Sequence, residues 1–152
     1  LIALQNPIAS DLSIMRPSLL PGLLRALKYN QDRQESRVRL LENGLTFARS
    51  DDGTILQIQK IAGLASGDLH PDSWQAKPQK LSFYDVKKDI ETLIAPRERR
   101  STSWRPTDEI ACMHPGRTAE LLIAGQSAGF LGELHPAVRP KLDIDGPVVL
   151  FE

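Results

Sequence analysis

Four segments with the residue pattern of β-strands, joined in pairs by very short turns, constrain the fold of this chain most. Apolar and polar residues alternate imperfectly from Arg37 to Arg49, turn residues follow at Asp51-Asp52-Gly53, and a second strand is expected from Ile55 to Ser66. The second pair, on either side of a two-residue turn, consists of Thr118 to Ala124, Gly125-Gln126 and Ser127 to Leu134. Because tight turns join antiparallel neighbours, the sequence predicts an α+β fold, an antiparallel β-sheet flanked by helices.

Two helices are predicted from apolar residues spaced three and four apart. The first runs from about Leu19 to Tyr29, with Pro21 in its first turn, where a missing N–H is tolerated. The second begins after Ser82, which acts as N-cap with Asp85 as its capping-box partner. We expect Pro96 to end this helix, because proline cannot continue the hydrogen-bond ladder.

The other segments are shorter and carry weaker signals. We expect a short strand at Leu1 to Leu4, an exposed excursion at Gly67 to Lys80, a loop leading to an edge strand at Arg97 to Pro106, a short helix from His135-Pro136 to about Leu142, and a final strand after Gly146-Pro147. The total comes to about six or seven strands and two or three helices.

Length and composition limit what the chain can be. Its 152 residues, 41% of them hydrophobic, suffice for one domain, which we expect to span residues 1–152. Nineteen basic residues balance nineteen acidic ones, so no net field draws the whole chain to a polyanion or an anionic membrane. The single cysteine, Cys112, cannot form an internal disulfide, and no apolar run could span a bilayer, so we expect a cytoplasmic location.

Both ends of the sequence resemble internal positions of a longer protein. The first residue is Leu1 rather than methionine, and Val148 to Glu152 has the pattern of a strand with no turn after it. We therefore expect this chain to be a piece of a longer polypeptide.

Some residues invite a chemical role when taken alone. His70, His114 and His135 each precede proline, which is typical of loops and turns and fits no metal-ligand spacing. We expect His114 and His135 to shape loops by hydrogen bonding. Cys112 has no defined histidine partner and is interpreted as a small strand residue rather than a nucleophile.

Basic and aromatic residues in polar stretches are candidates for contacts with RNA or another subunit. They are Arg97, Arg99 and Arg100, which form a basic knot, together with Trp74 and Trp104. The arginines could contact RNA phosphates or simply lie in a solvated loop. Each tryptophan could anchor an interface or cover the core from a loop.

Three blocks of sequence, taken in order, cover most of the chain. The blocks are Asn6-Pro7-Ile8-Ala9-Ser10 with Met15-Arg16-Pro17-Ser18-Leu19-Leu20-Pro21-Gly22-Leu23-Leu24, Asn30, Arg33 and Leu41-Glu42-Asn43-Gly44, then Phe83-Tyr84-Asp85-Val86-Lys87, and finally His114-Pro115-Gly116-Arg117-Thr118-Ala119 with Gly129-Phe130-Leu131-Gly132-Glu133-Leu134-His135-Pro136. Together they touch nearly the whole chain, and in this order they resemble the bacterial phenylalanine–tRNA ligase β subunit. The shared order of the blocks makes the match specific, since no single block is specific by itself.

The resemblance implies a catalytic-like module that copies the fold of class II aminoacyl-tRNA synthetases. Active relatives hold ATP with an arginine on a hairpin strand, followed at the next-but-one position by an acidic residue. Here Phe47 is followed by Ala48-Arg49-Ser50-Asp51, so an arginine is present and an acidic residue, Asp51, stands at the next-but-one position. The Gly-rich strand at Gly129 to Glu133 resembles the closing strand of active relatives only loosely. We therefore expect no adenylation chemistry and no catalytic, cofactor-binding or metal-binding residue in this chain.

Arg16 is the charge that the resemblance makes most interesting. It precedes an apolar helix where class II relatives present side chains to their substrate cleft. Two interpretations stay open, a structural pair with Glu42 or Asp11, which we favour slightly, and a contact with substrate.

The resemblance also implies a biological setting. The family forms an α2β2 tetramer that uses ATP and Mg²⁺ to esterify phenylalanine to tRNA(Phe). This module is expected to hold the α subunit and to help position the tRNA, with no membrane partner. The alternative is an independent domain, derived from a class II synthetase, that binds an amino acid or a nucleotide by itself.

Overall fold

The structure is a computed structural model that describes residues 1–9, 13–71, 73, 77–98 and 101–152, with the side chains of 95–98 left out. Its elements are α1 (Leu20–Gln31), β1 (Val38–Arg49), β2 (Ile55–Ser66), α2 (Phe83–Glu98), β3 (Thr102–Pro106), β4 (Met113–Ile123), β5 (Gln126–Leu134), the 3₁₀ helix η2 (Arg139–Leu142) and β6 (Val148–Phe151). Within the described part of the chain, no helix is both long and apolar enough to cross a membrane.

A single six-stranded sheet organises the molecule. Its strand order is β1-β2-β6-β5-β4-β3, and every neighbouring pair is antiparallel. The last strand in the sequence therefore lies between the two hairpins. The predicted α+β class, with an antiparallel sheet and flanking helices, is confirmed.

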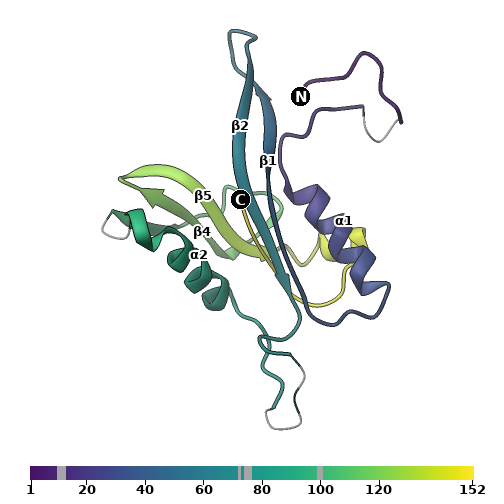
Figure 1. Ribbon diagram of the computed structural model, residues 1–152, viewed down its shortest axis with the longest axis vertical. Coiled ribbons are helices and arrows are strands. Elements are labelled where there is room, and N and C mark those ends of the chain that lie inside the picture. Colours follow the sequence, from purple (N-terminus) through teal and green to yellow (C-terminus); the bar gives the residue numbers. More distant parts are fainter. Residues whose placement is uncertain (10–12, 72, 74–76, 99–100) are drawn as a thin grey trace.

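The helices cover opposite faces of the sheet (Figure 1). Along β6, Val148 and Leu150 belong to the core under α1, whereas Val149 belongs to the core under α2, which contains Val86 and Ile90. Alternate residues of a strand point to opposite faces, so four residues of β6 serve both cores. These two sides are called the α1 face and the α2 face below.

Both predicted hairpins are present, and one turn is displaced by a residue. β2 occupies the predicted range, and Arg49 pairs with Ile55 across the first turn. The second turn is formed by Ala124 and Gly125, not by Gly125 and Gln126, with φ values of 51° and 78°. A two-residue turn that matches the twist of a hairpin needs positive φ at both central residues, and Gln126 already belongs to β5.

Two helix boundaries differ from the prediction. Pro96 does not end α2, which continues to Glu98. A proline removes one hydrogen bond, and this loss is tolerated close to a helix end, where few bonds remain. The short helix begins at Arg139 rather than at His135-Pro136, because a turn closed by the Val138 N–H on the His135 carbonyl, at 2.9 Å, comes first.

The N-terminal residues form an internal bridge instead of the predicted strand at Leu1 to Leu4. Only Ala3 pairs, with Ile14, and the Leu4 N–H donates to the Ser13 carbonyl at 2.8 Å. α1 follows close to its predicted range, with a proline in its first turn.

Candidate functional site

A charged cluster lies where the N-terminus of α1 meets β1 and β2. We call it the α1 cluster, and its members are Arg16, Glu42, Lys60 and Glu152. Arg16 Nη1 lies 2.6 Å from Glu42 Oε1, and Arg16 Nε donates to the Leu45 carbonyl at 2.8 Å. The guanidinium crosses β1 above Gly44, where a side chain would collide with it. The predicted pairing of Arg16 with Glu42 is confirmed.

Glu152 caps the N-terminus of α1 together with Ser18, whose Oγ accepts the Leu20 N–H at 3.1 Å. No side chain at the N-cap position bonds the helix, but Glu152 Oε1 accepts the Leu19 N–H at 2.6 Å. Glu152 Oε2 pairs with Lys60 Nζ at 3.0 Å, and the Glu152 side chain is only 4% exposed. The positive end of the helix dipole and the ammonium group together compensate the buried carboxylate.

The charges of the α1 cluster do not suit the binding of a nucleoside triphosphate. Stabilising a triphosphate requires cations that converge on it and are free to bind its oxygens. Here Arg16 and Lys60 are each paired with a carboxylate, and both carboxylates would repel phosphate. A substrate-facing role for Arg16 stays a prediction.

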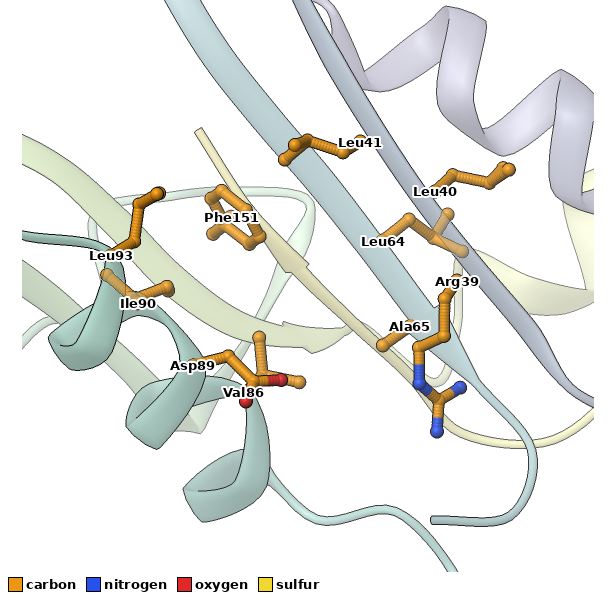
Figure 2. Close-up of a pocket in the computed structure, with 10 residues that line it drawn as sticks. All are labelled: Arg39, Leu40, Leu41, Leu64, Ala65, Val86, Asp89, Ile90, Leu93 and Phe151. Carbon is orange, nitrogen blue, oxygen red and sulfur yellow. The ribbon is translucent and has the colours of Figure 1, made fainter. Parts of the chain in front are cut away.

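An apolar groove lies on the α2 face, between α2 and the β1–β2 hairpin (Figure 2). It measures about 300 Å³. Its lining, from three strands and α2, consists of Arg39, Leu40, Leu41, Leu64, Ala65, Val86, Asp89, Ile90, Leu93 and Phe151. Figure 2 shows the Phe151 ring between the leucines of α2 and β1, with Arg39 and Asp89 below them. Such a groove suits apolar side chains and offers few groups for catalysis.

Arg39 closes one end of the groove through its guanidinium. Nη1 donates to the Val38 and Ser66 carbonyls at 2.8 and 2.6 Å, and Nη2 donates to the Asp68 carbonyl at 2.7 Å. Burial, followed by the charge of Arg37, lowers the pKa of the Arg39 side chain, but an arginine stays protonated. Its contacts tie β1 to the end of β2, which is a structural role.

Trp104 attaches the edge strand to α2. Its ring is partly buried in the core under α2, and its Nε1–H donates to Glu91 Oε1 at 3.0 Å. Lys87 Nζ lies 5.7 Å from the ring centroid and pairs with Glu91 at 2.9 Å. Of the two interpretations left open, covering the core is the one this geometry supports.

Both predicted loop-shaping histidines make a hydrogen bond to the backbone, but His135 lies at a turn whereas His114 lies within β4, so the loop prediction for His114 is wrong. His114 Nδ1 accepts the Gly116 N–H and His135 Nδ1 accepts the Ala137 N–H, each at 3.1 Å. In both cases the ring accepts the N–H of the residue after the proline, and at His114 this occurs where the register of β4 is irregular, between Met113 and Thr118. The ring centroids lie 6.4 Å apart.

Cys112 lies in a turn just before β4, so its prediction as a strand residue is wrong. The Met113 N–H donates to the Ile110 carbonyl at 2.8 Å, which bends the chain at this point. Burial raises the pKa of the Cys112 thiol, which keeps it protonated and a poor nucleophile. Among the residues that the structure describes, no group of three or more histidine, cysteine, aspartate or glutamate side chains could hold a metal ion.

Several residues singled out from the sequence are not among those that the structure describes. Trp74, Arg99, Arg100 and Asp11 lie outside the described residues. Arg97 belongs to α2, but its side chain is outside the described part. Their contacts with tRNA or another subunit therefore stay predictions.

Sequence reasoning missed Glu152 and Arg39. Both act through contacts with residues far along the chain, such as Leu19 and Asp68, and neither lies in a recognisable motif. The one available signal is the charge itself, because a glutamate next to the apolar run Val148 to Phe151 and an arginine between Val38 and Leu40 each need a partner.

The fold and the neutralised cluster define an α+β module built on an antiparallel sheet, with a helix on each face. The family model described as the phenylalanyl tRNA synthetase beta chain CLM domain matches residues 1–152, and the chain belongs to this family.

Similar proteins carry the name phenylalanine–tRNA ligase beta subunit. The protein of Hahella chejuensis is 45% identical over 151 residues, that of Nitrosospira multiformis 44% over 151 residues, and that of Yersinia pestis 40% over 153 residues. Each alignment covers 99% of this chain but only 19%, 18% and 19% of the relative, respectively. The chain therefore spans about a fifth of the length of the curated relatives that it matches.

Proposed function

We propose that this chain is a non-catalytic structural and assembly module of a phenylalanine–tRNA ligase β subunit. In this role it supports the α subunit of an α2β2 enzyme and helps to position tRNA(Phe) while the complex uses ATP and Mg²⁺. It works in the cytoplasm, and its sheet is a relative of the class II synthetase fold. The family match and the antiparallel sheet support this assignment.

One observation carries the non-catalytic part of the proposal. At the N-terminus of α1, where the resemblance places a substrate cleft, Arg16 and Lys60 are engaged by Glu42 and Glu152. Binding a triphosphate there would break two ion pairs and leave two carboxylates unpaired beside an anion. The cluster instead fixes α1 to β1 and β2, which is what a scaffold requires.

Phenylalanine-dependent exchange of pyrophosphate into ATP tests this proposal directly. The isolated chain should give background exchange, whereas the intact α2β2 enzyme, assayed in parallel, should be active. Exchange above background by the isolated chain would remove the non-catalytic assignment.

Ligand-induced stabilisation separates this proposal from an independent ligand-binding domain. A ligand at one hundred times its dissociation constant stabilises a protein by about 2.7 kcal/mol. We expect no rise in melting temperature with ATP or phenylalanine. A rise with either ligand would favour the independent domain.

Assembly has its own test. Tagged chain should retain the α subunit of a closely related ligase when the two are co-expressed, and Leu41→Lys, which places a charge at the mouth of the apolar groove, tests whether that groove takes part. If the Leu41→Lys variant no longer retains the α subunit but has an unchanged melting curve, the groove takes part in the contact with the α subunit. No retention of the α subunit by the unmodified chain contradicts the assembly role.

A further inference from the structure

The inner edge of β2 is open along most of its length. β1 pairs with all twelve residues of β2, but β6 pairs only with Gly63 to Ser66. From Ile55 to Ala62, no described strand pairs with the side of β2 that faces away from β1. Figure 1 shows the β1–β2 ribbon rising beyond the rest of the sheet, while β4 and β5 curve away from it.

Apolar side chains gather along this open edge. The exposed ones are Ile55, Leu56, Ile58 and Ile61, with exposed fractions of 52%, 43%, 42% and 45%. Because successive residues of a strand point to opposite faces, the edge is apolar on both sides. Lys60 is the one charged residue in this stretch, and it is turned to Glu152.

The other edges of the described sheet are protected in part. β3 has five residues and carries Arg105 and Pro106, which both discourage further pairing. At the outer edge of β1 the N-terminal segment contacts Leu45 and Phe47, because the Phe47 N–H donates to the Arg16 carbonyl at 2.9 Å and Arg16 Nε donates to the Leu45 carbonyl. Natural proteins rarely leave a long, apolar strand edge uncovered. The edge of β2 therefore has the features of a pairing site.

We propose that the β2 edge from Ile55 to Ala62 receives a further strand, in line with β6 and antiparallel to β2. The direction follows from the register, since β6 runs from Val148 opposite Ser66 to Phe151 opposite Gly63 and so points along the open edge. The occupant is an extended segment with apolar side chains on both faces, supplied by a part of the same β subunit outside residues 1–152. Relatives about five times longer than this chain have the polypeptide to provide it. The inference deepens the proposed assembly role and rests on it for its setting.

Amide hydrogen exchange in the intact β subunit tests this proposal. In peptides covering 55–62, the amides that face away from β1 should exchange about a hundredfold more slowly in the intact subunit than in the isolated chain, because an added strand removes them from water. Peptides covering 63–66, already paired on both sides, should change little. Protection in the intact β subunit alone supports the proposal. Rapid exchange in every sample, or protection that appears only after the α subunit is added, overturns it.

A matched pair of variants isolates the contribution of the apolar edge. Ile58→Lys should reduce the protection of 55–62 in the intact subunit by about tenfold, since a charge would be buried against the added strand. Thr54→Lys, in the adjoining turn, is the control and should leave the protection unchanged. Equal protection in both variants overturns the proposal. Pyrophosphate exchange by the isolated chain is unaffected by either result, so the failure of this inference and the failure of the non-catalytic assignment are distinguishable.

Discussion

The two halves of β2 differ in their residues, which are mostly large from Ile55 to Ile61 and mostly small from Ala62 to Ser66, and in their surroundings. From Ala62 to Ser66 most side chains are buried between α1, α2 and β6, whereas Ile55, Leu56, Ile58 and Ile61 are exposed. Both halves pair with β1 in one continuous register. Hydrogen bonding to one neighbour is therefore shared, and what distinguishes the surroundings of the halves is the second neighbour and the helices above it.

The comparison shows how stability is distributed along one strand. A two-stranded ribbon is marginal in water by itself, so the outer half depends on the inner half for its order. The inner half contributes to both cores through alternate residues, such as Leu64 under α1 and Ala65 under α2. Substitutions should therefore have effects that depend on which half they occupy.

The largest effect should come from truncating the same residue type in the two halves. Leu64 and Leu56 lie on the same face of β2, and they are 2% and 43% exposed. Leu64→Ala should cost about 2–5 kcal/mol, because it leaves a cavity in the core. Leu56→Ala should cost about 0.5 kcal/mol or less. Urea denaturation measures both, and equal costs would contradict the division of β2.

Gly63, close to the boundary between the halves, should be the next most sensitive position. A Cβ there would collide with the Phe151 ring and lie 3.2 Å from the Leu40 carbonyl oxygen. Gly63→Ala should therefore destabilise the protein by about 1–3 kcal/mol. Gly44→Ala on β1 is the matched control, because its Cβ meets mainly the movable end of Arg16. In thermal denaturation the melting temperature of Gly63→Ala should be clearly lower than that of Gly44→Ala. The reverse order would show that the chain is not tightly packed around Gly63.

A smaller effect is expected at the start of α2, which covers only the inner half. Asp85 Oδ2 accepts the Ser82 N–H at 2.8 Å and the Ser82 Oγ–H at 2.6 Å. Asp85→Ala should cost about 1 kcal/mol at neutral pH.

The same cap makes a prediction about pH. The Ser82 hydroxyl, followed by the Ser82 N–H, lowers the pKa of Asp85. A lowered folded pKa means that the stabilisation is present above the ordinary carboxyl value, about 4, and is lost as the pH falls through the folded value. The difference between wild type and Asp85→Ala should therefore shrink on acidification below pH of about 4. If the difference in free energy of unfolding between wild type and Asp85→Ala stayed constant down to a pH of about 2, the proposed stabilisation by the ionised Asp85 carboxylate would be contradicted.

The smallest stability effect should come from the outer half. Ile58→Thr should change the free energy of unfolding by less than about 0.5 kcal/mol. Because it makes an open apolar edge more polar, it should also reduce concentration-dependent association, as measured by light scattering. If Ile58→Thr associates as strongly as the wild type, the open edge of β2 is not the surface through which the chains associate.

The contrast within β2 also marks what the sequence can predict. Alternation and a short turn are local, and they are sufficient to predict β2 from Ile55 to Ser66 and its antiparallel pairing with β1, just as apolar spacing predicts α1. The capping pair Ser82 and Asp85 is equally local. The predicted position of the turn at Ala124 is wrong by one residue, because Gly125 can take either turn position.

Long-range contacts account for what the sequence does not predict. The pairing of Arg16 with Glu42 is one of two choices that the sequence leaves open, and nothing in the sequence indicates that Glu152 caps α1. Nothing in residues 55–66 tells which half will be covered, because the cover comes from β6 at the other end of the chain. Local sequence patterns therefore predict helices and strands, whereas the burial of a residue depends on contacts with distant parts of the chain.

Per-residue amide exchange in the isolated chain tests the division of β2 most directly. Amides paired between β1, β2 and β6, from Gly63 to Ser66, should exchange only through opening of the whole domain. Amides between Ile55 and Ile61 that face away from β1 should exchange at least about a hundredfold faster, because no second strand covers them. Uniformly slow exchange along β2 would contradict this account, since it would mean that the outer half is already enclosed.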